Sequence, residues 1–133
     1  MIEPYIPLPE KEVHGDVDFL ILFKEGFKLQ DVIDLLQLSK EEYILNNNLT
    51  ANIVYKKKQI DFNITASVEE LERCRFYKSY GGIGAFLGLL LPSKLVKFNE
   101  EGLQCMAYHD HLKMEFTVCN HVPSIITFYG LSP

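Results

Sequence analysis

The sequence predicts an α+β domain in which an antiparallel sheet of about five to seven strands packs with three to four short helices. Three observations favour this fold class. Apolar residues recur at helical spacing in some segments and alternate with polar residues in others. These segments do not follow one another as regular βαβ units, which argues against a doubly wound parallel sheet. The last third of the chain is rich in strand signals, so we expect a C-terminal meander there.

The length of 133 residues, of which 47% are hydrophobic, is typical of one domain with its own packed core. We expect an extended N-terminal arm over residues 1–15, because Pro4, Pro7 and Pro9 fix the backbone φ angle and remove hydrogen-bond donors. Residues 16–133 then form the single domain.

The first part of this domain predicts one strand followed by two helices. Val17–Phe23 is a short apolar run that ends at a turn, which favours a buried strand. Apolar residues at positions 29, 32, 33 and 36 have the spacing of an amphipathic helix. Ser39 and Glu42 have capping-box spacing, and they predict a second short helix that runs to Leu45 and ends in Asn46–Asn48.

This pair of helices, LQDVIDLLQLSKEEYIL, resembles a DNA-binding helix-turn-helix over about 20 residues. The resemblance implies that the second helix would read DNA. Gln37 replaces the glycine often found at such a turn, however, and the carboxylates of Glu41 and Glu42 would face phosphates unfavourably. We therefore expect an ordinary corner of two packed helices.

The middle of the chain predicts a hairpin and a capped helix. Thr50–Tyr55 and Ile60–Ala66 flank a run of three lysines, which is typical of two strands joined at a solvated tip. Ser67 and Glu70 then have capping-box spacing, so we expect a helix from this point to about Lys78. Two consecutive glycines, at positions 81 and 82, should end it.

The segment Ile83–Leu91 is almost wholly apolar but too short to span a bilayer. We interpret it as a core helix, in which Gly84 and Gly88 would allow close approach to a neighbour. Four strands are predicted after it: Lys94–Phe98, Leu103–His109, Leu112–Cys119 and Ser124–Tyr129.

Five potential soft-metal ligands lie within 17 residues of the C-terminal third: Cys105, His109, His111, Cys119 and His121. A two-residue turn at Asp110 and His111 would place Leu103, Cys105, Ala107 and His109 on the same face as Leu112, Met114, Phe116 and Val118. We expect that face to be the core. Cys105 is then a buried thiol beside Phe116, Cys119 points to the opposite face, and His111 lies at a tip.

The five residues also lack the usual zinc spacings, so we predict no metal site. A small metal-binding protein or enzyme that uses His109, His111, Cys119 and His121 remains the alternative. Cys74 lies on a predicted helix with no sequence signal that couples it to a histidine. The spacing of Gly82, Gly84 and Gly88 departs from that of phosphate-binding loops. We therefore predict no enzyme activity and no cofactor.

The chain carries 18 Asp and Glu against 13 Lys and Arg, a net charge of −5. This charge disfavours nucleic acid and anionic membranes as partners and favours a basic protein. The N-terminus has no continuous apolar segment of the kind found in secretory signals. The three cysteines are irregularly spaced, as expected of reduced thiols, so we predict a cytoplasmic protein.

These patterns predict a non-catalytic protein-binding module, most concretely an immunity or antitoxin-like inhibitor that neutralises a toxin or enzyme by direct binding. A homodimeric structural subunit or secretion chaperone is a further alternative, with Ile83–Leu91 or an open sheet edge at its interface. The candidate contact residues are acidic side chains and nearby tyrosines that are typical of interface anchors. They are Glu41, Glu42, Glu69, Glu70, Glu72, Tyr77, Tyr80, Glu100 and Glu101.

Overall fold

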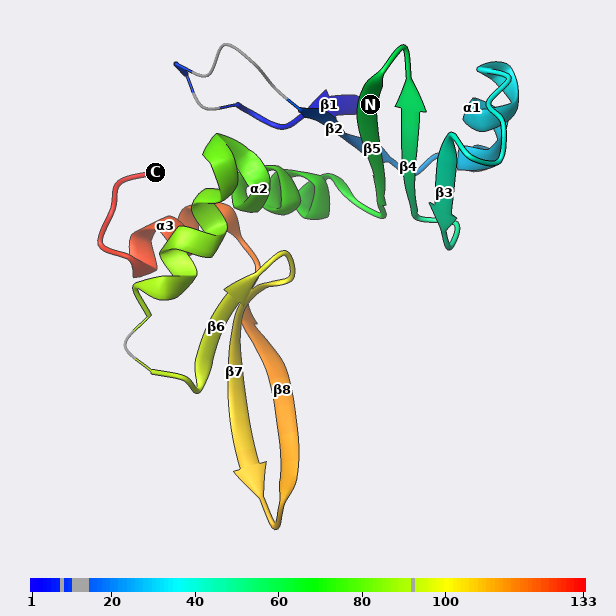
Figure 1. Cartoon of the computed structure of the whole chain (residues 1–133). Helices are drawn as coiled ribbons and strands as arrows, with labels where there is room; N and C mark the ends of the chain where they lie inside the picture. Colours follow the sequence, from blue (N-terminus) through cyan, green and yellow to red (C-terminus); the bar gives the residue numbers. More distant parts are fainter. Residues whose placement is uncertain (8, 11–14, 92) are drawn as a thin grey trace. The chain divides into compact units, whose positions relative to one another are not determined.

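A computed structural model describes residues 1–7, 9–10, 15–91 and 93–133 of the chain (Figure 1). It confirms the α+β class. The backbone divides into two compact units. Unit 1 comprises Met1–Tyr5 and Pro9–Leu71, and unit 2 comprises Ile6–Leu8 and Glu72–Pro133.

Unit 1 contains a five-stranded sheet in the order β1-β2-β5-β4-β3, with one short helix, α1. The strands β2 and β5 pair in parallel, whereas the other neighbours pair antiparallel. The sheet is therefore mixed, where the sequence predicted an antiparallel one. The bounds are β1 Ile2–Pro4, β2 Asp16–Leu22, α1 Leu29–Leu35, β3 Tyr43–Asn46, β4 Thr50–Tyr55 and β5 Lys58–Thr65.

In the described part of the predicted N-terminal arm, Ile2–Pro4 is extended and forms the edge strand β1 beside β2. Residues 8 and 11–14 of this predicted arm lie outside the described residues. The predicted hairpin is also confirmed, since β4 and β5 pair antiparallel and enclose Lys56 and Lys57. Both lysines have positive φ angles, 49° and 64°, as the tight turn requires.

The core of unit 1 forms where one face of the sheet meets the start of α1. Ile21, Leu29, Ala51 and Ile64 form a buried cluster there. The helical stripe predicted from Leu29 is confirmed in part, because Leu29 and Ile33 are buried whereas Leu36 is half-buried. Burial of such side chains is the main stabilising contribution to a small sheet of this kind.

The predicted second helix is wrong. Ser39 and Glu42 do form the expected contact, with the Ser39 amide donating to Glu42 Oε2 at 2.9 Å. That contact closes a single turn, after which Tyr43–Asn46 continues as strand β3. Tyr43, Ile44 and Leu45 pair along β4, and their aromatic or branched side chains suit a pleated surface. The chain therefore forms no helix-turn-helix and no corner of two helices here.

The helix α2 (Val68–Leu89) begins as the sequence predicts. Ser67 Oγ accepts the Glu70 amide at 3.1 Å, and the Glu70 carboxylate accepts the Ala66 amide at 2.7 Å. The backbone leaves the helical conformation at residues 79–82, where Gly81 and Gly82 have φ angles of 70° and 88°. The predicted break between two helical segments is thus confirmed, and the second segment belongs to unit 2.

In that second segment Leu87 is buried, whereas Phe86, Leu89 and Leu90 are exposed. The interpretation of Ile83–Leu91 as a core element holds for one side of the segment only. A Cβ atom at Gly84 would collide with the ring of Tyr77, so the predicted close approach is confirmed at this glycine. Across the described part of the chain, no helix is long and apolar enough to cross a membrane.

Unit 2 contains an antiparallel sheet in the order β6-β7-β8, which confirms the C-terminal meander. The bounds are β6 Val96–Asn99, β7 Gly102–His109 and β8 Leu112–Cys119. The predicted two-residue turn joins β7 to β8: Asp110 and His111 have φ angles of 45° and 67°.

The predicted strand Ser124–Tyr129 is wrong, because these residues belong to helix α3 (Val122–Phe128) and its C-terminal cap. Pro123 occupies the first turn, where its missing amide hydrogen costs nothing. Ile125 is fully buried and packs against Leu87, Phe98 and Leu103. This packing outweighs the strand preference of the branched residues in the segment.

Candidate functional site

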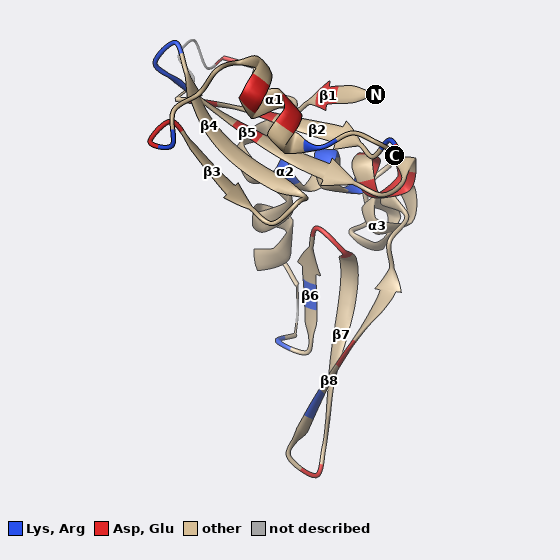
Figure 2. Cartoon of the chain, turned by 90° about the vertical axis from the view of Figure 1, so that its right-hand side faces the viewer, with Lys and Arg blue, Asp and Glu red and all other residues tan. Residues whose placement is uncertain are grey.

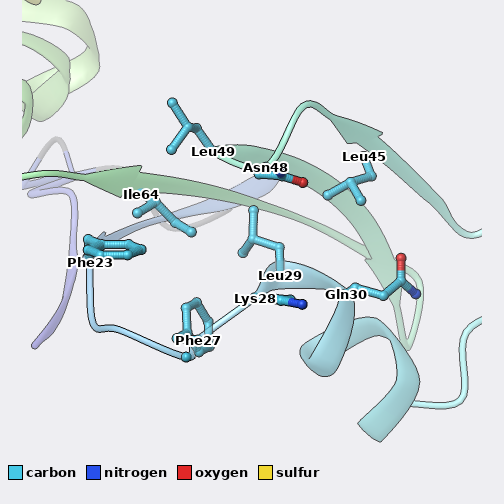
Figure 3. Close-up of a pocket in the computed structure, with 10 residues that line it drawn as sticks. Phe23, Phe27, Lys28, Leu29, Gln30, Leu45, Asn48, Leu49 and Ile64 are labelled. Atoms are coloured by element: carbon cyan, nitrogen blue, oxygen red, sulfur yellow. The ribbon is translucent and has the colours of Figure 1, made fainter.

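An open, apolar pocket of about 370 Å³ lies in unit 1. Figure 3 shows Phe23 and Phe27, from the connection between β2 and α1, with Leu29 and Ile64 nearby. Phe23, Phe27 and Leu29 are close together in the sequence, whereas Ile64 comes from β5. An apolar concavity of this size accepts one bulky side chain or a small molecule.

The rim of the pocket is formed by the turn between β3 and β4. Asn47 Oδ1 accepts the Leu49 amide at 2.7 Å, and the Leu49 carbonyl accepts the Ile64 amide at 2.7 Å. Leu49 is therefore held from both sides while its side chain stays half exposed at 53%. Polar groups at the pocket come from Lys28, Gln30 and Asn48.

The net charge of the chain is concentrated in unit 1. This unit has 13 of the 18 Asp and Glu residues and 7 of the 13 Lys and Arg residues, a net charge of −6. Unit 2 has the remaining 5 acidic and 6 basic residues, a net charge of +1. In Figure 2 the acidic residues of α1 are coloured red along the ribbon; they are Asp31 and Asp34.

The hairpin of β7 and β8 exposes an apolar stripe in unit 2. Leu112, Met114, Phe116 and Val118 are between 51% and 67% exposed. Cys105 does lie opposite Phe116, as predicted, but it is half-buried. The sequence predicted that the face with Leu103, Cys105, Phe116 and Met114 belongs to the core. This prediction is wrong from Cys105 to the tip of the hairpin. The pairing of β6 with β7 ends at Cys105, and β7 and β8 extend past that point (Figure 1).

A β-bulge between Leu103 and Gln104 changes the side-chain parity of β8. Cys119 therefore lies opposite Leu103 and packs against the buried cluster of unit 2. The prediction that Cys119 points to the opposite face of the sheet is wrong for this reason. An extra residue in one strand reverses every later inside–outside assignment.

The other face of the hairpin carries a charged group of three side chains. Lys97 Nζ lies 2.7 Å from Glu115 Oε2, and Lys113 Nζ lies 2.6 Å from Glu115 Oε1. Hydrogen bonds from Lys113 and Lys97 lower the pKa of Glu115 to about 2. The same carboxylate raises the pKa of Lys113.

The four alternative metal ligands do not come together. His109 and His111 lie at the exposed tip of the hairpin, with His109 Nε2 3.3 Å from an Asp110 carboxylate oxygen. His121 precedes α3, and its Nδ1 lies 2.9 Å from Ser124 Oγ. Among the residues that the structure describes, no three His, Cys, Asp or Glu side chains are grouped to hold a metal ion.

Four of the predicted contact residues lie in unit 1. Glu41 and Glu69 are exposed. The Glu42 carboxylate accepts hydrogen bonds from Ser39, and Glu70 is half-buried at the start of α2. Glu42 and Glu70 thus have local structural roles, whereas Glu41 and Glu69 are exposed.

The other five lie in unit 2. Glu72 is exposed, whereas Tyr77 packs edge-on against Phe98 with ring centroids 5.1 Å apart. Tyr80 is 41% exposed, and its amide donates to the Ile6 carbonyl at 2.6 Å. The Glu100 carboxylate pairs with Lys78 at 2.9 Å, and Glu101 accepts from Gln104 at 2.7 Å. The nine candidates are therefore divided between the units.

The sequence analysis missed both the pocket and the exposed stripe. Phe23 and Phe27 flank the turn Lys24–Gly26, and this pair of aromatic residues beside a turn is the signal that could have indicated a pocket wall. The chain matches no protein-family model and no curated protein.

Proposed function

We propose that this protein is a non-catalytic protein-binding module and that unit 1 captures a basic partner protein. The observation that carries the proposal is the presence of a net charge of −6 and an open apolar pocket in the same unit. A surface of one charge sign accelerates the approach of an oppositely charged protein. An apolar pocket then holds a buried anchor side chain, the kind of contact that dominates binding energy.

The chemistry of the pocket defines the expected partner more closely. Its walls suit an aromatic or aliphatic side chain that projects from a basic surface. Lys28, Gln30 and Asn48 offer hydrogen-bonding groups for the backbone beside that anchor. When the covered surface is the active site of a basic enzyme or toxin, the complex is an inhibited one, as with immunity proteins and antitoxins.

The proposal places the protein in the cytoplasm. Cys74, Cys105 and Cys119 form no disulfide bond with one another; Cys74 is buried and the other two are half-buried. Reduced thiols are the usual state of cysteine in a reducing compartment.

Affinity capture from a lysate of the native host tests the proposal with two matched variants. Leu49→Lys places a charge on the pocket rim, whereas Leu35→Lys makes the same change at an exposed leucine of α1 that is not part of the pocket lining. We expect the wild-type chain and Leu35→Lys to retain the same basic protein at low salt. Leu49→Lys should retain at least about tenfold less, because it loses one buried anchor contact.

Raising the salt concentration should weaken capture steeply, since screening removes the long-range attraction. A retained protein that is acidic, or that binds both variants equally, would contradict the proposal, and so would recovery of the bait alone. Titration of the retained protein's own activity with the wild-type chain then tests inhibition. Loss of that activity at one equivalent supports the inhibitor, and unchanged activity rejects it.

A further inference from the structure

The strand β8 forms one edge of the sheet in unit 2. Each of its residues Leu112–Val118 is exposed. An edge strand presents unpaired backbone amide and carbonyl groups to any strand that aligns with it. The two charged residues of this strand, Lys113 and Glu115, have opposite signs.

We infer that β8 pairs antiparallel with β8 of a second copy, centred on Met114, so that two three-stranded sheets join into one about a two-fold axis. This inference concerns unit 2 and does not depend on the function proposed for unit 1. Three features of the strand carry it: its backbone geometry, its charge pattern and its apolar stripe.

The backbone geometry follows from the turn. His109 and Leu112 flank the two-residue turn and are paired with each other. In such a hairpin the flanking pair exchanges hydrogen bonds, and hydrogen-bonded pairs then alternate along the ladder. Leu112, Met114 and Phe116 therefore direct their backbone groups toward β7. Lys113 and Glu115 direct theirs to the free edge, where a second strand can bind them.

The charge pattern selects the register. Residues that face each other across two strands must have their side chains on the same face of the sheet. With Met114 at the two-fold axis, Lys113 of each copy lies opposite Glu115 of the other. A shift of two residues either way would bring Lys113 opposite Lys113 or Glu115 opposite Glu115, and like charges that face each other directly are destabilising.

The apolar stripe gains cover in the same register. Leu112 of each copy lies opposite Phe116 of the other, and the two Met114 side chains meet at the axis. These three side chains are more than half exposed in the single chain. Burial of these side chains against the second copy contributes favourably to the free energy of dimerisation. An isolated ion pair at a surface contributes little to that free energy.

Light scattering on the wild-type chain and on two charge variants, each alone and then mixed, tests the inference. The wild-type chain should have a mass of twice 15.3 kDa at about 100 µM protein. Lys113→Glu and Glu115→Lys each place like charges opposite each other, so each variant alone should dimerise at least about tenfold more weakly. An equimolar mixture of the two should recover the dimer, because in a mixed pair the two chains again place opposite charges across the axis at both facing positions.

The mixture keeps the test valid if one variant folds less well, because recovery requires the two chains together. A wild-type chain that stays monomeric overturns the inference, and so do variants that dimerise like wild type or a mixture that stays monomeric. A dimer that survives both charge variants but is lost in Leu89→Glu also overturns it, since that result places the interface at the exposed end of α2.

Oxidative cross-linking tests the register. Two cysteines at position 114 would meet at the axis as a directly opposed pair, within the Cα separation that a disulfide spans. We expect Met114→Cys to form a covalent dimer, and Leu112→Cys, which faces position 116, to form several-fold less under the same oxidant. Equal cross-linking of the two variants would overturn the register centred on Met114.

Discussion

The two units of this chain offer different surfaces for association. Unit 1 has a net charge of −6 and an apolar pocket, whereas unit 2 is nearly neutral and exposes the apolar stripe of β8. Electrostatic attraction between two proteins extends over about a Debye length and increases the rate at which they associate. Pairing of two strands requires direct contact and a matching register. The proposed capture of a basic partner would thus use a long-range attraction, whereas the proposed pairing of β8 would depend on short-range contacts.

Each unit has its own core, and substitution of one buried side chain in each unit tests whether the two cores are independent. Ile125 in unit 2 and Ile21 in unit 1 are both buried and belong to the core clusters of their units. Ile125→Ala and Ile21→Ala should each cost about 2–5 kcal/mol through lost contacts and the cavity left behind. Urea unfolding measures the loss. Hydrogen exchange should show it concentrated in the substituted unit, and an equal loss of protection in both units would contradict their separation.

Two glycines of α2 test how tightly unit 2 packs. Gly84→Ala should destabilise the protein by about 1–3 kcal/mol, because the new methyl group collides with the Tyr77 ring. Gly88→Ala is the matched control: its Cβ would lie 3.7 Å from the Phe98 carbonyl oxygen, an ordinary contact. That change should be neutral or slightly stabilising through helix propensity. Thermal unfolding of both variants checks this, and equal effects would contradict the close approach at Gly84.

Two serines of unit 1 share the same capping-box spacing but have different structural roles. Ser67 caps α2, whereas Ser39 closes a single turn before β3. Ser67→Ala should therefore cost about 1 kcal/mol, the usual effect of a lost N-cap. Ser39→Ala should cost less than half of that, because the retained backbone amide at position 39 still donates to Glu42. Equal destabilisation of the two variants in urea would contradict this difference.

The smallest expected effect concerns the pH dependence of Glu115. The pKa of this carboxyl is about 2 in the folded chain, below its unfolded value of about 4.3. The stabilisation is therefore fully present above about pH 4.3 and is lost as the pH falls toward 2. Titration of the Glu115 carboxyl carbon by NMR should give a midpoint near 2. Lys113→Met should raise it, and an unchanged midpoint would reject the hydrogen bond as the cause.

Local patterns predicted the parts of the fold that local interactions determine. The β4–β5 hairpin, the capped start of α2 and its break at Gly81 and Gly82 each depend on residues within a few positions. The errors at residues 39–45 and 124–129 arose where tertiary packing decided between helix and strand. Ile125 contacts Leu87 and Leu103, which no local pattern contains.

The candidate sites were harder to predict for a related reason. The pocket collects Phe23, Leu45 and Ile64 from segments that meet only after the sheet has formed. The stripe on β8 has the alternation of a buried strand, and its exposure depends on how far the buried cluster of unit 2 covers that face of the hairpin. The division into units falls within α2, between Leu71 and Glu72, where the helical pattern continues without a linker.

The parallel pairing of β2 with β5 has a consequence for how the chain reaches this fold. Asp16 pairs with Gln59, so most of unit 1 must be synthesised before β2 gains this neighbour. The strands β6, β7 and β8 are joined by two-residue turns, so each pairs with a strand that is its neighbour in the sequence. Since folding slows as contacts become more distant in sequence, the β6–β8 sheet should form faster than the sheet of unit 1, although it follows that sheet in the chain.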